Sequence, residues 1–175
     1  YNATNGGPAS ENITDKIFAE SQKIKEYKIL EADNYDISTL GIGKLGGMYV
    51  EVFDGTSDYI EMMKGLIDFN AIKTLFAKGF TIRFDALNAI TGPYAKKIFE
   101  QELGAKEGSV VNYIPMPDFG GGHPDPNLVY AKNLVDFMFS KEAADFGAAS
   151  DGDGDRNMIL GRGIFINPND SLAVI

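Results

Sequence analysis

The sequence predicts an α/β fold in which a mixed, mainly parallel sheet is flanked by helices. Strand and helix patterns alternate between Phe80 and Ser150, and glycine or proline marks the ends of most helix patterns. A further apolar run follows the third strand of this series after a loop of only six residues. The alternation is typical of parallel strands, and the direct return predicts an antiparallel neighbour for the third strand. With 175 residues the chain can bury a core.

The first part of the chain predicts one helix and one strand with a polar segment between them. Ser10 is a candidate N-cap, and apolar side chains recur on one face of the helix that follows: Ile13, Ile17, Ile24 and Tyr27. Residues 31–47 are polar and interrupted by glycines, which favours a linker or crossover. Residues 48–53 form a short apolar run, and we expect a strand there.

Two helices and a strand are expected next. Ser57 or Asp58 is a candidate cap for the first helix, whose inward side chains we expect to be Tyr59, Met63, Leu66 and Ile67. Residues 69–77 continue as a second helix closed by Gly79. Residues 80–87 have the pattern of a strand, because Ile82, Phe84 and Ala86 share one face at a period of two.

The remaining patterns complete the alternation. A helix is expected from Gly92-Pro93 to Gly104, and residues 110–114 have the pattern of a strand. Asp125-Pro126 is predicted to start another helix, in which Leu128, Ala131, Val135 and Met138 recur at helical spacing. Residues 145–150 form the third strand, which leads directly into an acidic segment.

The acidic segment, Asp151-Gly-Asp-Gly-Asp-Arg156, is the strongest functional signal in the chain. Glycines at alternate positions allow three carboxylates to turn toward one point, and such oxygen ligands suit Mg²⁺ or Ca²⁺. The alternative is an Asp/Gly-rich surface turn. The position after the third strand favours a metal site at Asp151, Asp153 and Asp155, because ligands of open α/β sheets bind outside the carboxyl ends of strands. An EF-hand is excluded, since it requires glycine in place of Arg156 and glutamate in place of Arg162.

Other polar residues are weaker candidates. Arg156 has two open roles, because its guanidinium could bind an anion beside the metal or pair with the neighbouring carboxylates. His123 is the only histidine, which excludes a histidine-pair metal site and a serine triad with a second histidine. We interpret His123 as a loop histidine rather than a proton shuttle, and Asp118 and Asp125 as turn and cap residues.

Composition limits the classes of partner. The net charge is −9, from 25 acidic and 16 basic residues, and the lack of a Lys/Arg cluster argues against nucleic-acid binding. No apolar run approaches the ~20 residues that span a bilayer, so no transmembrane segment is expected. The absence of cysteine excludes disulfides and fits a cytoplasmic location.

Several motifs together give the chain a resemblance to the phosphoglucomutases of the α-D-phosphohexomutase superfamily. They cover nearly the whole sequence: Asn5-Gly-Gly-Pro-Ala9, Ile13-Thr-Asp-Lys-Ile17, Asp68-Phe-Asn-Ala-Ile-Lys73, Gly92-Pro-Tyr-Ala-Lys-Lys97, His123-Pro-Asp-Pro-Asn127, Asp145-Phe-Gly-Ala-Ala149, the acidic segment and Asn167-Pro-Asn-Asp-Ser171. The resemblance implies part of a larger four-domain enzyme that interconverts glucose 1-phosphate and glucose 6-phosphate through glucose 1,6-bisphosphate and a phosphoserine. It implies Mg²⁺ at Asp151, Asp153 and Asp155, with Arg156 as a candidate catalytic residue beside the metal loop.

The resemblance also implies a domain organisation. Residues 1–54 would end a first α/β domain, and residues 55–175 would form most of a second domain that is truncated in its last helix. The family's phosphoserine loop, sugar-recognition loop and C-terminal phosphate-binding domain have no counterpart in these residues. Gly122 stands where close relatives usually carry histidine. The chain would therefore supply the metal loop, depend on the remaining domains of the same polypeptide, and be inactive alone.

Two alternatives stay open beside the mutase hypothesis. A parafusin-like phosphoprotein of regulated exocytosis is a relative of this enzyme and would place membrane docking or signalling above catalysis. A stand-alone cation-binding module would need only the acidic segment, and it predicts a polypeptide that ends near Ile175.

Overall fold

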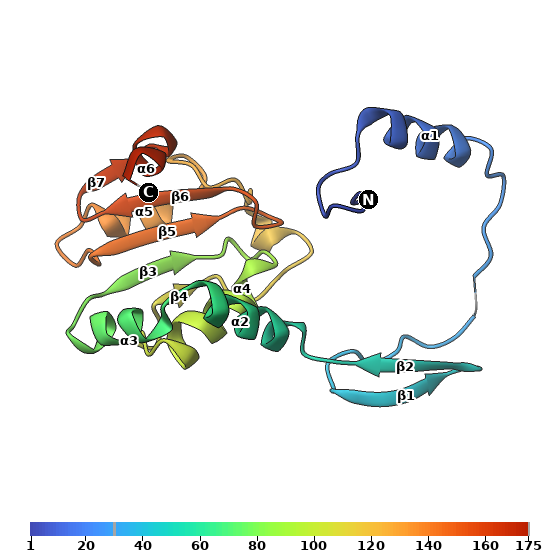
Figure 1. Ribbon diagram of the computed structural model, residues 1–175, viewed down its shortest axis with the longest axis horizontal. Helices are drawn as coiled ribbons and strands as arrows, with labels where there is room; N and C mark the ends of the chain where they lie inside the picture. The colour runs from blue at the N-terminus through green and yellow to red at the C-terminus, as the bar shows by residue number, and fades with distance from the viewer. Residues whose placement is uncertain (30, 175) are drawn as a thin grey trace. The chain divides into compact units, whose positions relative to one another are not determined.

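The computed structural model describes residues 1–29 and 31–174, which form two compact units divided between Phe53 and Asp54. The first unit contains α1(Glu11–Ser21) and an antiparallel hairpin of β1(Gly41–Leu45) and β2(Met48–Val52) (Figure 1). None of its described residues is buried. Two expectations need correction here. The segment 31–47, expected to be a linker, contains strand β1, whose glycines interrupt the alternation of apolar residues that predicts a strand. Helix α1 ends before Ile24 and Tyr27, which were expected on its apolar face.

The second unit is built on a five-stranded sheet with the order β4-β3-β5-β6-β7. Its strands are β3(Ile82–Asp85), β4(Val110–Val111), β5(Phe146–Ser150), β6(Asn157–Gly161) and β7(Ile164–Ile166). Strand β3 pairs parallel with β4 and β5, whereas β6 pairs antiparallel with β5 and β7. The mixed sheet and the antiparallel return after the acidic segment are confirmed. The antiparallel share is larger than expected because β7 adds a further strand at the edge.

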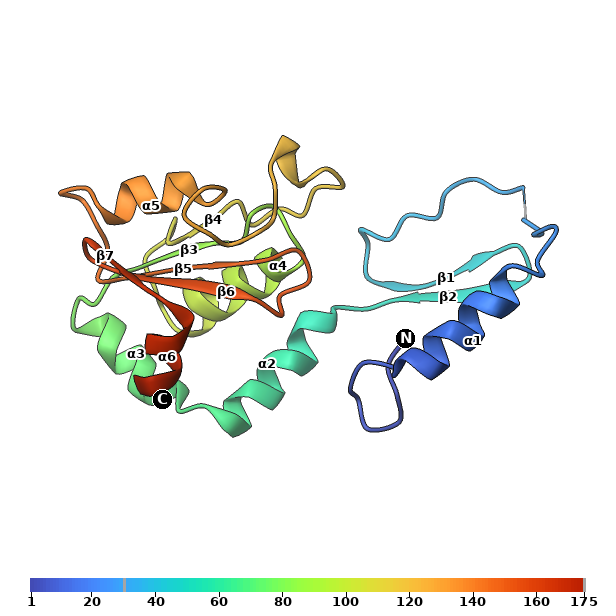
Figure 2. The ribbon, with the colours of Figure 1, turned by 90° about the horizontal axis from the view of Figure 1, so that it is seen from above.

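Helices cover both faces of this sheet (Figure 2). One face carries α2(Gly55–Leu66), α3(Phe69–Ala77), α4(Thr91–Ala95), its π-helical continuation η1(Lys96–Glu102) and α6(Pro168–Val174). The other carries α5(Lys132–Met138). Two apolar clusters form the core. The first lies between α5 and the sheet and includes Leu134, Met138, Ala149 and Leu160. The second lies on the opposite face of the sheet and includes Ile60, Phe69 and Leu103. No helix within residues 1–29 and 31–174 is long and apolar enough to cross a bilayer.

Two helices begin at different residues from those expected, because nearby side chains bond to backbone amides. Asp54 caps α2 by accepting a hydrogen bond from Thr56 N at 3.0 Å, ahead of the predicted Ser57 or Asp58. Ile60 is the buried residue of α2, and Met63 packs against its cluster as expected. The other three residues expected to face inward are exposed: Tyr59, Leu66 and Ile67. Helix α5 begins at Lys132 rather than at Pro126. Between Pro126 and Lys132, the side-chain oxygen of Asn127 accepts hydrogen bonds from the amides of Val129 and Tyr130, which makes this segment a turn.

Strands β3 and β4 both end earlier than expected because the backbone leaves the extended region after their carboxyl ends, and β3 also begins two residues later than expected. Asn112, directly after β4, has φ +49°, and Leu87, two residues after β3, has φ +51°. In the described residues, the complete set of non-glycine residues with positive φ is Leu87, Asn88, Asn112 and Phe119. Unusual backbone is therefore concentrated in the loops at the edge of the sheet from which the acidic segment also emerges. The last of these loops contains the short helix η2(Phe119–Gly121).

Candidate metal centre

The acidic segment is a six-residue connection between the neighbouring strands β5 and β6. Ser150 and Asn157 form the last pair of the antiparallel ladder, and Asp151 N donates to the carbonyl of Arg156 at 3.1 Å. The loop therefore starts at the carboxyl end of β5, which is itself parallel to β3. This is the position that the sequence predicted, and it is where open α/β sheets place their ligands.

Asp151 organises the loop from a buried position, with only 2 % of the residue exposed. Its Oδ1 accepts hydrogen bonds from Gly154 N at 2.9 Å and from Arg156 N at 3.1 Å. Its Oδ2 accepts from Arg156 Nε at 2.9 Å. Burial alone would raise the pKa of Asp151, but these hydrogen bonds outweigh burial and lower it. The carboxylate is thus held ionised and fixes the path of the chain around it.

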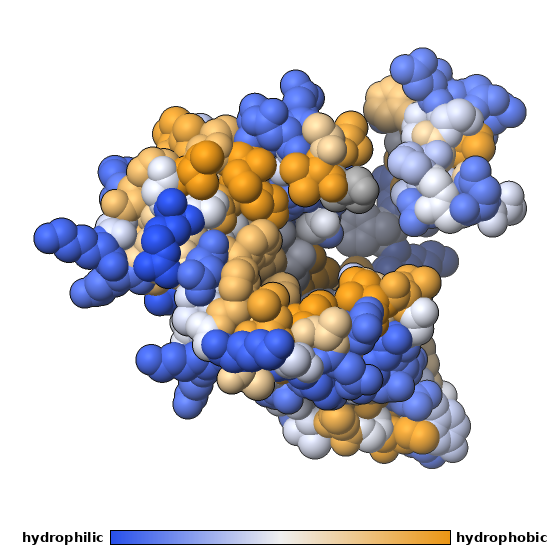
Figure 3. All heavy atoms as spheres, turned by 60° about the vertical axis from the view of Figure 1, so that its left-hand side comes forward, coloured by the Kyte–Doolittle hydropathy of each residue, from blue (hydrophilic) through white to orange (hydrophobic). Residues whose placement is uncertain are grey.

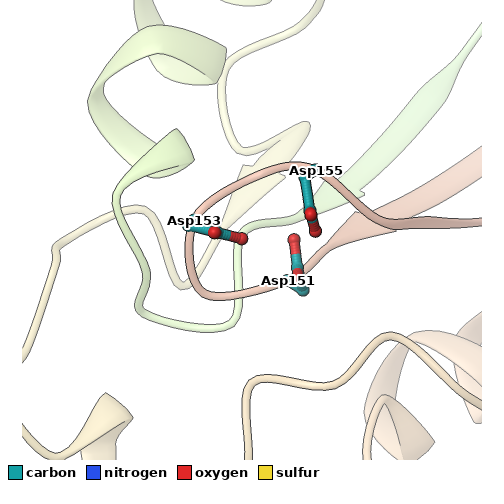
Figure 4. Close-up of side chains that lie close together, drawn as sticks. All are labelled: Asp151, Asp153 and Asp155. Atoms are coloured by element: carbon teal, nitrogen blue, oxygen red, sulfur yellow. The ribbon is translucent and has the colours of Figure 1, made fainter. Parts of the chain in front are cut away.

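Asp153 and Asp155 are exposed and converge on Asp151 (Figure 4). One carboxylate oxygen from each of the three lies within 4.8 Å of the others. Two oxygens bound to one cation lie at most about 4.2 Å apart for Mg²⁺ and about 5.2 Å apart for Ca²⁺, twice the metal–oxygen distance. The three residues therefore fit a single hard cation, and a small closure of the exposed side chains would suit Mg²⁺.

The charges of the cluster are unbalanced within the protein. The pKa of Asp155 is raised by its contact with the Asp151 carboxylate and, next, by the charge of Asp153. Carboxylates that crowd together in this way resist ionisation unless a cation offsets their repulsion. The donor chemistry therefore favours a divalent cation over the alternative of a simple surface turn.

Arg156 pairs with carboxylates in the structure, which is one of the two roles that the sequence left open, and its role toward an anion stays a prediction. Its Nε bonds to Asp151, and its NH1 lies 3.4 Å from Asp125 Oδ1. The side chain is nevertheless 64 % exposed, so the guanidinium reaches solvent beside the loop. The sequence alone predicts a turn or cap role for Asp125. Its ion pair with Arg156 spans 31 residues and leaves no local pattern.

The loop around His123 shows packing rather than catalytic geometry. The imidazole stacks on the ring of Tyr130, with centroids 4.2 Å apart and planes at 14°. Asp118 accepts from Gly120 N at 3.1 Å, as a turn residue does. Pro124 and Phe119 lie against Gly152 of the acidic segment. The His123 loop therefore forms a wall of the candidate centre, without a carboxylate bound to the histidine among the described contacts.

Two hydroxyl residues beside the acidic segment were not recognised from the sequence. Thr91, at the start of α4, has its Oγ1 2.6 Å from Ser150 Oγ. Ser150 is buried and directly precedes Asp151. The only signal for Ser150 was its adjacency to the acidic segment, and Thr91 had no signal because 59 residues separate the two.

An apolar groove of about 630 Å³ opens next to the acidic segment. It is bounded by aromatic and aliphatic residues of α2, α3, α4 and η1, and it reaches Ser150, Asp153 and Gly154. Apolar side chains gather on both sides of a hollow in Figure 3. The carboxylates therefore lie where a polar loop meets an apolar surface.

Comparison with known proteins identifies the family. The family described as phosphoglucomutase/phosphomannomutase, alpha/beta/alpha domain II, matches residues 57–163. A phosphoglucomutase from Rhizobium radiobacter is 54% identical over 175 residues, and a cytoplasmic phosphoglucomutase from Populus tremula is 50% identical over 186; each alignment covers 100% of this chain and 32% of the relative.

A solved structure gives the same result. The exocytosis-sensitive phosphoprotein pp63/parafusin (phosphoglucomutase) from Paramecium, in an open form, has a TM-score of 0.86 and 42% identity. The match covers 97% of this chain and 33% of that one, so the chain spans about a third of the length of the proteins it matches. The resemblance read from the motifs is confirmed, and the chain belongs to the phosphoglucomutase/phosphomannomutase family.

Proposed function

We propose that these residues are the metal-loop portion of a longer phosphoglucomutase that interconverts glucose 1-phosphate and glucose 6-phosphate. The observation that carries the proposal is the convergence of three carboxylates on one loop in a chain 54% identical to a phosphoglucomutase. Residues 1–54 would end the first domain and residues 55–175 would belong to the second. A match to the family's domain II over residues 57–163 supports that assignment.

The proposed cofactor is Mg²⁺, held by Asp151, Asp153 and Asp155. When bound, it would neutralise charge on phosphoryl oxygens, which is the main requirement of phosphoryl transfer. Arg156 would remain held by Asp151 and Asp125 while its exposed guanidinium faces the phosphate of the substrate. The proposed phosphoserine and the sugar-binding groups would be supplied by other parts of the polypeptide. A protein of net charge −9 could in this way bind an anionic sugar phosphate.

Replacing one exposed ligand tests this proposal. In the full-length protein, Asp153→Asn should lower turnover of glucose 1-phosphate roughly a hundredfold and raise the Mg²⁺ concentration needed for half-maximal rate. Asp58→Asn is the matched control, because Asp58 is also exposed but lies in the first turn of α2. An unchanged rate at low Mg²⁺ in Asp153→Asn would remove Asp153 from the set of ligands.

A parafusin-like role is the second candidate, and the similarity to pp63/parafusin favours it. Sedimentation of the intact protein with membranes in the presence of Ca²⁺, measured beside mutase activity, separates the two roles. Membrane binding by a protein without mutase activity would favour the exocytosis role. An intact mass near 19.0 kDa would instead favour a stand-alone cation-binding module, since the relatives are about three times longer.

The cellular location is a separate proposal. We propose a cytoplasmic protein, as for the relative from Populus tremula. A relative from Arabidopsis thaliana that is named chloroplastic matches at 51% identity, so microscopy of the tagged full-length protein is the deciding measurement.

A further inference from the structure

Thr91 contacts Gly154 of the acidic segment and Ser150, the residue that precedes the segment, through the two branches of its side chain. Its hydroxyl lies 2.6 Å from the hydroxyl of Ser150, the residue before Asp151. Its methyl group faces Gly154, since a Cβ added at position 154 would lie only 2.7 Å from Thr91 Cγ2. Thr91 is therefore in contact with the start of the loop and with the residue between Asp153 and Asp155.

The position of Thr91 is itself fixed by close backbone packing. The next residue, Gly92, lies so near the end of β4 that a Cβ there would be 2.1 Å from the carbonyl oxygen of Tyr113. The amide of Gly92 also donates to the carbonyl of Ala89 at 3.1 Å. Side chains longer than hydrogen are thus excluded at position 92, and Thr91 has little freedom to move away from the loop.

The contact with Gly154 matters because this glycine sets the shape of the loop. Gly154 has φ +84°, a conformation that other residues rarely adopt, and its amide donates to Asp151 Oδ1. The two exposed carboxylates flank it in the chain. A shift of Gly154 away from Asp151 would therefore separate the exposed carboxylates from the buried one.

We propose that Thr91 is a positioning residue for the cation site, which holds the loop so that the three carboxylates can share one ion. The inference rests on the proposed function, because it takes Asp151, Asp153 and Asp155 as the ligands. Thr91 acts through Ser150 and Gly154 and touches none of the ligand oxygens among the described contacts. Residues that orient the ligands of a metal typically change its affinity by about ten- to a hundredfold when they are replaced.

Three variants of the full-length protein separate positioning from simple stabilisation. Thr91→Val keeps the shape but leaves the buried Ser150 hydroxyl without its partner, whereas Thr91→Ser keeps the hydroxyl. The double variant Thr91→Val with Ser150→Ala removes both hydroxyls, so it should recover stability, because no buried polar group is left unpaired. A positioning role predicts that it does not recover cation affinity.

The measurement is the dissociation constant of Mn²⁺, used as a paramagnetic probe for Mg²⁺, together with the unfolding midpoint of each variant. We expect the constant to rise roughly tenfold in Thr91→Val and in the double variant, and less in Thr91→Ser. Affinity that follows the unfolding midpoint, or that stays unchanged in Thr91→Val, would overturn the positioning role alone. A wild-type protein that binds neither Mn²⁺ nor Mg²⁺ would overturn the metal site and this inference together.

Discussion

Two buried aspartates end neighbouring strands of the sheet, and only one belongs to the candidate metal centre. Asp85 is the last residue of β3 and Asp151 follows β5; each is 2 % exposed. Each uses Oδ1 to accept a backbone amide further along its loop, from Leu87 in one case and from Gly154 in the other. Burial and backbone contacts therefore do not distinguish a loop-forming aspartate from a ligand.

The two aspartates differ in the other side chains that surround each carboxylate. Asp85 also accepts from Asn112 Nδ2 at 2.8 Å, a neutral donor that ties the loop after β3 to the loop after β4. Asp151 instead faces Asp153 and Asp155, which leave the cluster with excess negative charge despite Arg156. A buried carboxylate whose neighbours are donors is part of the framework. One that also faces two exposed carboxylates is a candidate metal ligand.

Removing the charge from each of these two aspartates in turn should affect catalysis very differently. Asp151→Asn in the full-length protein should lower the turnover number of the proposed mutase reaction about a hundredfold, because it removes a proposed metal ligand. Asp85→Asn should lower it less than about tenfold, since an amide oxygen can still accept both hydrogen bonds of Oδ1. Equal losses in the two variants would show that Asp151 acts only as a framework residue.

Truncation should reverse the order of the two effects when stability is measured. Asp85→Ala leaves Leu87 N and Asn112 Nδ2 without an acceptor, which should lower the free energy of opening by about 3 kcal/mol. Asp151→Ala leaves three donors without an acceptor but also removes repulsion from Asp153 and Asp155, so about 1 kcal/mol is expected. Hydrogen exchange of the β3 and β5 amides in the metal-free protein gives both values. A larger loss in Asp151→Ala would contradict the assignment.

Asp145, at the opposite end of β5, gives the smallest expected effect and is a control that lies outside the candidate metal centre. Its pKa is lowered from 3.8 to about 2, first by the amide of Thr81, then by Arg162 and by the hydroxyl of Thr81. A lowered pKa stabilises the fold above pH 3.8, and this stabilisation is lost as the pH falls toward about 2. Asp145→Asn should therefore flatten the dependence of the unfolding midpoint on pH between about 4 and 2. An unfolding midpoint that falls as steeply with pH in the variant as in the wild type would refute the stabilising role of the Asp145 carboxylate.

Local patterns were sufficient for much of the fold and for the location of the candidate centre. The alternation of strands and helices, the antiparallel return of β6 and the position of Asp151 all follow from short-range periodicity and turn residues. The start of α5 was missed because the side chain of Asn127 forms a turn inside an apolar pattern. The β1 strand was missed because glycines interrupt it.

The contacts that shape the centre could not be predicted in the same way. The ion pair between Arg156 and Asp125 joins residues 31 positions apart in the sequence, and the hydrogen bond between Thr91 and Ser150 joins residues 59 positions apart. Such pairs arise only when the carboxyl ends of adjacent strands are brought together by the sheet. Their residue types alone are also compatible with ordinary caps and surface turns.

The short connection between β5 and β6 affects how cation binding is coupled to folding. The sheet already holds Ser150 opposite Asn157, so closing a loop of six residues between them costs little chain entropy. In small metal-dependent domains, by contrast, much of the binding free energy is used to fold the chain. Here that free energy would be available for affinity, and the proposed cation could dissociate and return many times without the domain unfolding.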